Sequence, residues 1–226
     1  LTPQLFLALT LLTFAIIGLL GNTHLITQFG ELNFTQENFD FQLRELAKAK
    51  IDLDTIEIPH IPPLLGFFAM LFQAIIAGST ISLPFMFGEE FGWRGLMLKE
   101  TKSLGFLKAN GFIGLVWGIW HFPVILMGHN YPHHPYLGII MMTLFTLSIS
   151  PLFAYARLKT KSILGACMMH GMLNASSILY SLYIANGNEL YSFVASWAGI
   201  AAGIILTICI LVFDKKFVEE YRATVN

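Results

Sequence analysis

The chain has 226 residues, of which 55% are hydrophobic and 12% are charged, whereas an average soluble domain has about 25% charged residues. This composition excludes an ordinary soluble domain and favours a polytopic membrane protein, with the lipid bilayer as a partner. The formal net charge of −1 points to no particular binding partner, and we expect no nucleic acid among the partners.

Charged residues are absent from five long runs, each long enough for a membrane span of about 20 residues. The third run holds two spans, because "GHNYPHHPY" (128–136) interrupts it. We therefore predict an all-α fold, a polytopic bundle of about six transmembrane helices forming a single membrane domain over 1–226. The expected helices cover residues 3–20, 63–87, 111–128, 136–156, 162–184 and 192–213.

The first helix is expected to be a membrane span and not a signal peptide, because it lacks a basic leading segment and a small-residue cleavage site. The two cysteines, Cys167 and Cys209, lie within predicted spans. We interpret them as apolar packing residues, since free cysteine behaves as a small hydrophobic residue.

The segment 31–60 is expected to be an extracytoplasmic loop. Phe39, Leu43 and Leu46 recur at helical spacing, so we predict an amphipathic helix over 36–50 with Thr35 as its cap. The following "IDLDTIEIP" alternates like an extended segment. A solvated lid between two spans is favoured over a surface that touches lipid or substrate.

The stretch "GEEFGWRG" (88–95) places two acids and an arginine at the end of the second span. On a helix Glu90 and Arg94 are four residues apart and can pair. Glu89 projects about 100° away, so it stays free for proton transfer. An interfacial charge cluster is the alternative. A straight span that begins at Pro63 would end before Glu89, so Glu89 requires a later start, a tilt or a water-filled cleft.

Polar side chains also occur inside two later spans. His121 lies in "VWGIWHFPV", where Pro123 loosens the helix. His170 and Asn174 lie in "CMMHGMLNASS", four residues apart and on one helix face. Ionisable residues within a membrane usually mark function. The alternatives are a packing role for His121 and a helix–helix hydrogen bond made by His170 and Asn174.

The turn before the fourth span contains His129, His133 and His134. Three histidines in six residues can bind a metal at the outer face. A proline-rich turn with solvated imidazoles is the favoured interpretation.

A carboxylate, two imidazoles and a carboxamide in one membrane cavity suit hydrolysis. Glu89 can take a proton from an attacking water that His121 holds, while His170 and Asn174 can donate to the oxyanion. Glu89, His121 and His170 are also a ligand set that zinc accepts. These residues therefore leave a bare glutamate base and a metal-bound water as alternatives, with a divalent metal such as zinc as the candidate cofactor. The chain has no H-E-x-x-H, no G-x-S-G and no aspartate in a predicted span.

Three motifs in this order resemble the CAAX prenyl protease and bacteriocin-processing family (CPBP, Abi-like) of intramembrane endopeptidases. They read Glu89-Glu90-Phe-Gly-Trp-Arg94, Trp117-Gly-Ile-Trp-His121 and His170-Gly-Met-Leu-Asn174. The resemblance covers a motif-bearing core of roughly 80–180. The second motif usually begins with Phe, where this chain has Trp117.

The resemblance implies that Glu89 activates water, with Glu90 and Arg94 of the same motif in support. It implies that the histidine of the second motif assists, and that His170 and Asn174 stabilise the oxyanion. The substrate would be a peptide or protein, which in some members is lipid-modified. Members are described both as glutamate-dependent and as metalloproteases, so the metal stays open.

Two other classes of function remain as alternatives. A non-catalytic membrane scaffold or immunity protein would use the polar cavity only for binding. A small proton- or cation-coupled transporter would relay ions through Glu89, His121 and His170.

Basic residues indicate the orientation. Of the 13 Lys and Arg residues, 10 follow the second, fourth and sixth spans. By the positive-inside rule both termini face the cytoplasm. We expect a multi-pass protein of a bacterial cell membrane whose chemistry lies near the cytoplasmic face. The sequence does not specify an oligomeric state.

Overall fold

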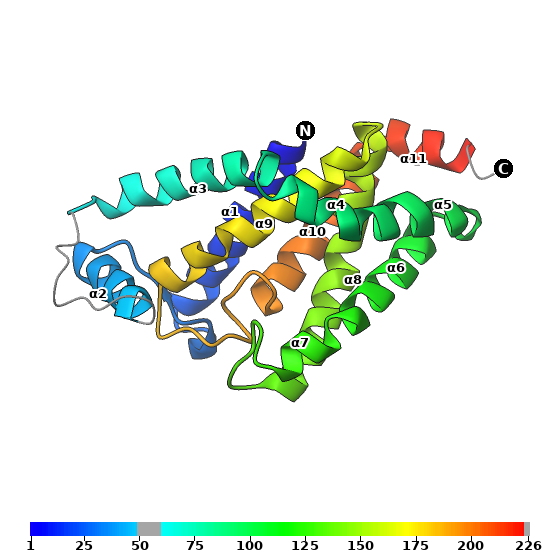
Figure 1. The fold of residues 1–226 in the computed structure, drawn as a ribbon. Helices are drawn as coiled ribbons and strands as arrows, with labels where there is room; N and C mark the ends of the chain where they lie inside the picture. The colour runs from blue at the N-terminus through cyan, green and yellow to red at the C-terminus, as the bar shows by residue number, and fades with distance from the viewer. Residues whose placement is uncertain (49–59, 224–226) are drawn as a thin grey trace.

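The computed structural model describes residues 1–48 and 60–223, which form a bundle of helices with one two-stranded sheet (Figure 1). The predicted all-α membrane bundle is confirmed. The elements in chain order are α1 (Thr2–Gly21), η1 (Thr27–Phe29), β1 (Glu31–Leu32), α2 (Gln36–Lys48), α3 (Pro63–Ser79), α4 (Leu83–Glu90), η3 (Phe91–Met97), α5 (Leu98–Glu100), η4 (Lys102–Leu104), α6 (Phe106–Trp120), α7 (Phe122–Leu126), α8 (Pro135–Lys159), α9 (Ile163–Tyr183), β2 (Ile184–Ala185), α10 (Trp197–Phe213) and α11 (Lys215–Ala223).

The six predicted apolar segments all contain helix, but they differ in length. Among the described residues, α1, α8 and α9 are each long and apolar enough to cross a membrane, and α3 together with α4–α5 does so as a pair bent by 62°. Helices α6 and α10 have 15 and 17 residues and are shorter than a typical span.

Two of the expected helices are broken, and each break precedes a proline. The helix expected over 63–87 stops at Ser79 and restarts at Leu83, since Pro84 has no N–H to donate to the carbonyl of Thr80. The helix expected over 111–128 stops at Trp120 for the same reason, with Pro123 at the start of α7. Each of these two expected helices is therefore divided in two near a proline.

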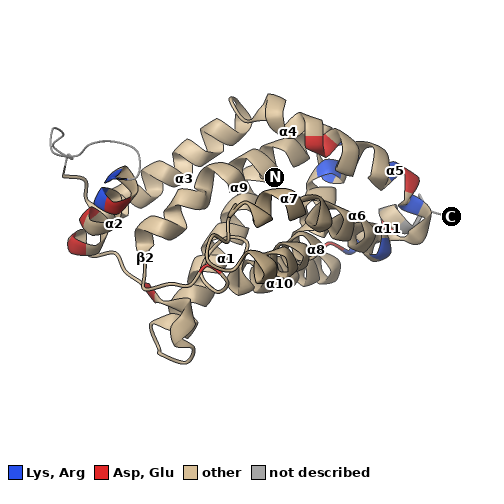
Figure 2. Cartoon of the chain, turned by 60° about the horizontal axis from the view of Figure 1, so that its bottom comes forward, with Lys and Arg blue, Asp and Glu red and all other residues tan. Residues whose placement is uncertain are grey.

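Charged side chains gather at the two ends of the molecule (Figure 2). One end carries α2, and the other carries α5 and α11, while the helices between them are largely uncharged. Large apolar side chains along α3, such as Phe68 and Phe72, are exposed. Because a bilayer supplies the apolar surroundings that these side chains need, this distribution fits a protein that spans a membrane.

Small residues let the helices around the centre approach closely. A Cβ atom on Gly118 of α6 would lie 2.5 Å from the Cα atom of Thr143 on α8. A Cβ atom on Gly78 of α3 would lie 2.4 Å from the backbone nitrogen of Met172 on α9. Such contacts are typical of membrane helix interfaces, and they bring the motif-bearing helices together.

The predicted amphipathic helix is confirmed as α2. The Thr35 hydroxyl accepts a hydrogen bond from the N–H of Asn38 at 3.3 Å, as expected for a cap. Phe39 is buried and its ring lies 5.5 Å from that of Tyr183 on α9. The expected end of this helix at residue 50 and the extended "IDLDTIEIP" lie outside the described residues.

The histidine-rich turn is tied to the neighbouring loop by Glu189. Its carboxylate accepts the backbone N–H of His133 and lies 3.0 Å from Nδ1 of His134. Within 1–48 and 60–223 no group of three metal-ligating side chains occurs. Cys167 and Cys209 are both free, as predicted.

Asp214 anchors the C-terminal helix α11. Its carboxylate accepts hydrogen bonds from Tyr155 at 2.7 Å, from Lys159 at 2.9 Å and from the N–H of Phe217 at 3.0 Å. The Lys159 and Tyr155 donors lower the pKa of Asp214 to about 2. Phe217 then packs its ring 5.3 Å from that of Phe106, which fixes α11 against α6 and α8.

We expect Asp214→Asn to lower the thermal midpoint in detergent by a few degrees at pH 7. A lowered folded-state pKa contributes stability that is complete above the unfolded value of about 4 and is lost as the pH falls through about 2. The variant should therefore lose less stability than wild type on acidification across this window. Exposed Glu100→Gln is the control, and equal acid sensitivity of wild type and Asp214→Asn would contradict the assignment.

Candidate active site

The bend after α3 brings the first motif into the bundle. Because the helix restarts at Leu83, Glu89 lies six residues, or about 9 Å, along the new segment. The tilt that the sequence left open is thus a 62° bend. The helix then passes into η3, a π-helical segment, and π-helical turns are frequent at functional sites.

Glu90 and Arg94 form the predicted ion pair, and the pair is fully buried. One guanidinium nitrogen of Arg94, Nη1, donates to both oxygens of Glu90 at 3.1 Å. The guanidinium carbon of Arg94 lies 4.4 Å from the ring centre of Trp117 and 4.5 Å from that of Phe153. The charge of Arg94 is therefore held between a carboxylate and two aromatic faces.

His170 makes a contact that the sequence did not predict. Its Nδ1 lies 2.9 Å from Oε1 of Glu90, and the ring is buried. An ionised carboxylate only accepts hydrogen bonds, so Nδ1 carries a proton and Nε2 is the nitrogen that remains for other partners. Glu90 therefore orients His170 as well as binding Arg94.

Trp117 contacts both Glu89 and His121. Its indole N–H donates to Oε2 of Glu89 at 3.3 Å. Its backbone carbonyl lies 2.8 Å from Nδ1 of His121, which must donate because a carbonyl only accepts. In the neutral imidazole, Nε2 of His121 is thus a free acceptor.

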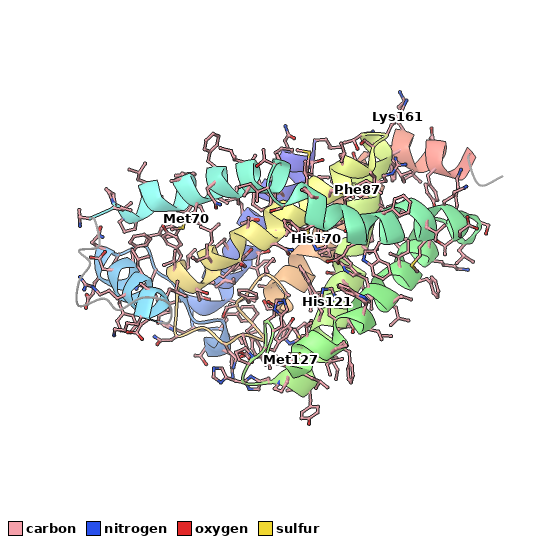
Figure 3. All side chains as sticks on the ribbon, in the orientation of Figure 1. Met70, Phe87, His121, Met127, Lys161 and His170 are labelled. Carbon is pink, nitrogen blue, oxygen red and sulfur yellow. The ribbon has the colours of Figure 1, made fainter. Side chains whose placement is uncertain are left out.

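The four predicted catalytic residues line one cavity of about 420 Å³. Glu89 reaches it from α4, His121 from the break between α6 and α7, and His170 with Asn174 from α9. Figure 3 shows the two histidines on their separate helices. Glu90 and Arg94 are absent from the lining and lie behind it. The predicted division between four cavity residues and two supporting residues therefore holds geometrically, and the catalytic roles stay predictions.

The rest of the cavity wall is mainly apolar. Phe145 and Ile149 of α8 and Leu173 of α9 line it, together with residues 193–195. Asn174 is exposed to the cavity, where its Nδ2 donates to the sulfur of Met86 at 3.4 Å. Such a cavity combines a polar corner with an apolar space for a side chain.

The candidate zinc ligands do not converge as a metal site. Within the described part of the chain, Glu89, His121 and His170 are not grouped closely enough to hold an ion together. Each histidine already uses Nδ1, on the Trp117 carbonyl or on Glu90, so only its Nε2 could serve as a ligand. The arrangement of these three side chains therefore does not fit a metal ion held by three protein ligands.

Two aromatic residues of the site were not singled out as functional by the sequence. Trp117 begins the second motif and was noted only as an aromatic. Phe153 lies in α8, where it is one apolar residue among many, and no sequence signal marks it. Only the tertiary structure places both rings on Arg94.

The sequence is similar to one protein family and to one curated relative. Residues 62–176, about half of the chain, match the family described as type II CAAX prenyl endopeptidase Rce1-like. The chain is also 29% identical over 140 residues to CAAX prenyl protease 2 of Methanococcus maripaludis, which covers 58% of this chain and 48% of that protein. The chain thus spans about half the length of this relative. No solved structure matches.

Removal of Arg94 should destabilise the fold. We expect Arg94→Ala to lower the free energy of unfolding by about 3–5 kcal/mol, because it leaves the charge of Glu90 buried with only His170 beside it. The activity of the Arg94→Ala protein should also be lower than that of wild type. The measurement is the thermal midpoint in detergent.

The matched control is Lys48→Ala, which breaks the exposed pair with Glu45. We expect an effect below about 1 kcal/mol there. An Arg94→Ala protein that unfolds no more readily than Lys48→Ala would show that the buried pair has no structural role.

Proposed function

The chain belongs to the type II CAAX prenyl endopeptidase Rce1-like family, and we propose that it is an intramembrane endopeptidase that uses a water activated by Glu89. The observation that carries this proposal is the convergence of Glu89, His121, His170 and Asn174 on one cavity within the bundle. Nothing in the cavity specifically favours a scaffold or a transporter, so those two classes become outcomes of the test.

The first step is the activation of water. The water lies between Glu89 and His121, with one proton directed at Oε1 of Glu89 and the other at Nε2 of His121. Glu89 removes the first proton as the water oxygen attacks the peptide carbonyl carbon. His121 acts as an orienting acceptor, because its Nδ1–H is occupied by the Trp117 carbonyl.

The second step is the stabilisation and collapse of the tetrahedral intermediate. Asn174 donates Nδ2–H to the oxyanion, and His170 donates from Nε2 in its imidazolium form. Glu90 orients the ring for this contact because its carboxylate accepts the Nδ1–H. As the C–N bond breaks, Glu89 returns its proton to the leaving amine, which restores the carboxylate.

We propose that the reaction takes place toward the cytoplasmic face. Glu89 precedes Lys99 by ten residues along one helical rod, or about 15 Å. Lys99 and Lys102 belong to the basic end, which the positive-inside rule assigns to the cytoplasm together with both termini.

The proposed substrate is a peptide or protein presented from the membrane. The apolar wall that Phe145, Ile149 and Leu173 form suits an apolar side chain or a lipid-modified one. The Methanococcus maripaludis relative is named a CAAX prenyl protease, and this name is the reason to include prenylated peptides among the probes.

The test is cleavage of membrane-tethered reporter peptides, with and without a prenyl group, by purified protein in lipid vesicles. We expect wild type to cleave and Glu89→Gln to be inactive with an unchanged thermal midpoint, because an amide cannot take the proton of water. Glu100→Gln makes the same change outside the cavity and should remain active. Equal cleavage by wild type and Glu89→Gln would remove Glu89 from the mechanism.

The other classes of function predict different results. A scaffold would cleave no peptide and would tolerate Glu89→Gln without loss of its binding. A transporter would move protons or cations across the vesicle membrane, which a pH-sensitive dye inside the vesicles detects. Either result without cleavage would overturn the endopeptidase proposal.

The oxyanion role of Asn174 makes a separate prediction. Asn174→Ala should lower kcat by about 10²–10³ with little change in KM, because the lost donor acts mainly in the transition state. Ile178→Ala, one turn further along the same helix and outside the cavity lining, is the control. A rise in KM with kcat unchanged would mean that Asn174 binds the substrate and does not stabilise the intermediate.

A further inference from the structure

We propose that Trp117 is a positioning residue, which holds Glu89 and His121 in the geometry that orients the attacking water. The inference rests on the proposed role of Glu89 as the base. It goes further because it assigns a function to an indole N–H and a backbone carbonyl that bind the base and the acceptor of the water.

The indole N–H is the structural link to Glu89. It donates to Oε2 at 3.3 Å, which leaves Oε1 of the same carboxylate for the proton of water. Glu89 pairs with no described Lys or Arg side chain, and Arg94 is directed at Glu90. When Oε1 takes up a proton, Oε2 becomes the carbonyl oxygen and still accepts the indole N–H, so the bond persists through the proton transfer.

The backbone of the same residue fixes the second water-binding group. The carbonyl oxygen of Trp117 lies 2.8 Å from Nδ1 of His121. This carbonyl is free to accept an imidazole because the N–H of His121, its partner in a regular α-helix, donates instead to the carbonyl of Gly118 at 3.2 Å. One residue therefore sets the direction of both the base and the acceptor between which the water lies.

The indole is held rigidly enough for this role. Its ring is 2% exposed and packs against Arg94 on one side, with the rings of Phe153 and His170 each 5.3 Å away. The backbone beneath it is fixed because Gly118, which has no side chain, lets α6 pack closely against α8. A side chain that cannot turn keeps its N–H on the carboxylate without loss of entropy during the reaction.

The structure offers a pair of matched variants. Trp117→Phe keeps an aromatic face for Arg94 and the backbone carbonyl for His121, and removes the N–H donor together with part of the ring. Trp93→Phe makes the same substitution nearby, where the indole N–H is buried and has no hydrogen-bond partner among the described residues. The two variants therefore separate the donor from the general effect of a smaller ring.

The kinetic arm uses the reporter peptide that wild type cleaves. We expect Trp117→Phe to lower kcat about tenfold or more, since a hydrogen bond to a charged group is lost, with little change in KM or thermal midpoint. Trp93→Phe should retain the kcat of wild type. A Trp117→Phe protein with the kcat of wild type would overturn the proposal, and so would an equal loss in both variants.

The spectroscopic arm needs no substrate. The chain has four tryptophans, so ¹⁵N-tryptophan labelling in lipid nanodiscs should give four indole N–H resonances, and Trp117→Phe identifies one. We expect Glu89→Ala to shift the Trp117 resonance upfield and to leave that of Trp93 in place. A Trp117 resonance that does not respond to Glu89→Ala would overturn the proposed bond.

The two arms keep this inference distinct from the proposed function. If Glu89→Gln cleaves as well as wild type, the proposed function fails, and the resonance still decides whether Trp117 binds Glu89. If Glu89→Gln is inactive but Trp117→Phe is fully active, the endopeptidase stands and the positioning role of Trp117 fails.

Discussion

The carboxylate of Glu90, buried away from water, is the constraint on which the arrangement of the motif-bearing helices depends. An uncompensated charge in such surroundings is strongly destabilising. Arg94 and His170 both bind this carboxylate, and Trp117 with Phe153 covers the arginine. These partners come from the first-motif segment, α6, α8 and α9, so satisfying one carboxylate draws four parts of the chain together.

The two neighbouring acids, Glu89 and Glu90, differ in burial and in hydrogen-bond partners. Glu90 is completely buried and neutralised, whereas Glu89 is part-exposed on the cavity and accepts a single neutral donor from Trp117. An ion pair commits a carboxylate to structure, while a single neutral hydrogen bond orients it. The different surroundings of the two adjacent positions fit the separate structural and catalytic roles that we propose, and the α-helical turn of about 100° per residue is what separates them.

Two prolines connect the backbone to the site. Pro84 ends α3 and allows the new helix to carry Glu89 into the bundle, and Pro123 ends α6 so that His121 lies at a break. In both places a membrane helix lacks regular backbone hydrogen bonds. A membrane protein tolerates this where the backbone borders other protein segments or a cavity. The breaks therefore shape the cavity rather than merely shortening two spans.

Much of this protein was predictable from local sequence. Uncharged runs located the helices, because lipid excludes charge over about 20 residues. Helical periodicity paired Glu90 with Arg94 and placed His170 on the face of Asn174, since both relations depend only on neighbours three or four residues away. The motifs likewise indicated which four side chains would share a cavity.

The remaining features depend on contacts between distant segments, and only the tertiary structure decided them. His170 meets Glu90 across 80 residues of sequence, and the indole of Trp117 meets Glu89 across 28. The bend after α3 was also undetermined, because a proline permits a break without specifying its angle. Periodicity describes one helix at a time, whereas the choice of partners depends on how glycine-lined faces pack, and packing is a property of the whole bundle.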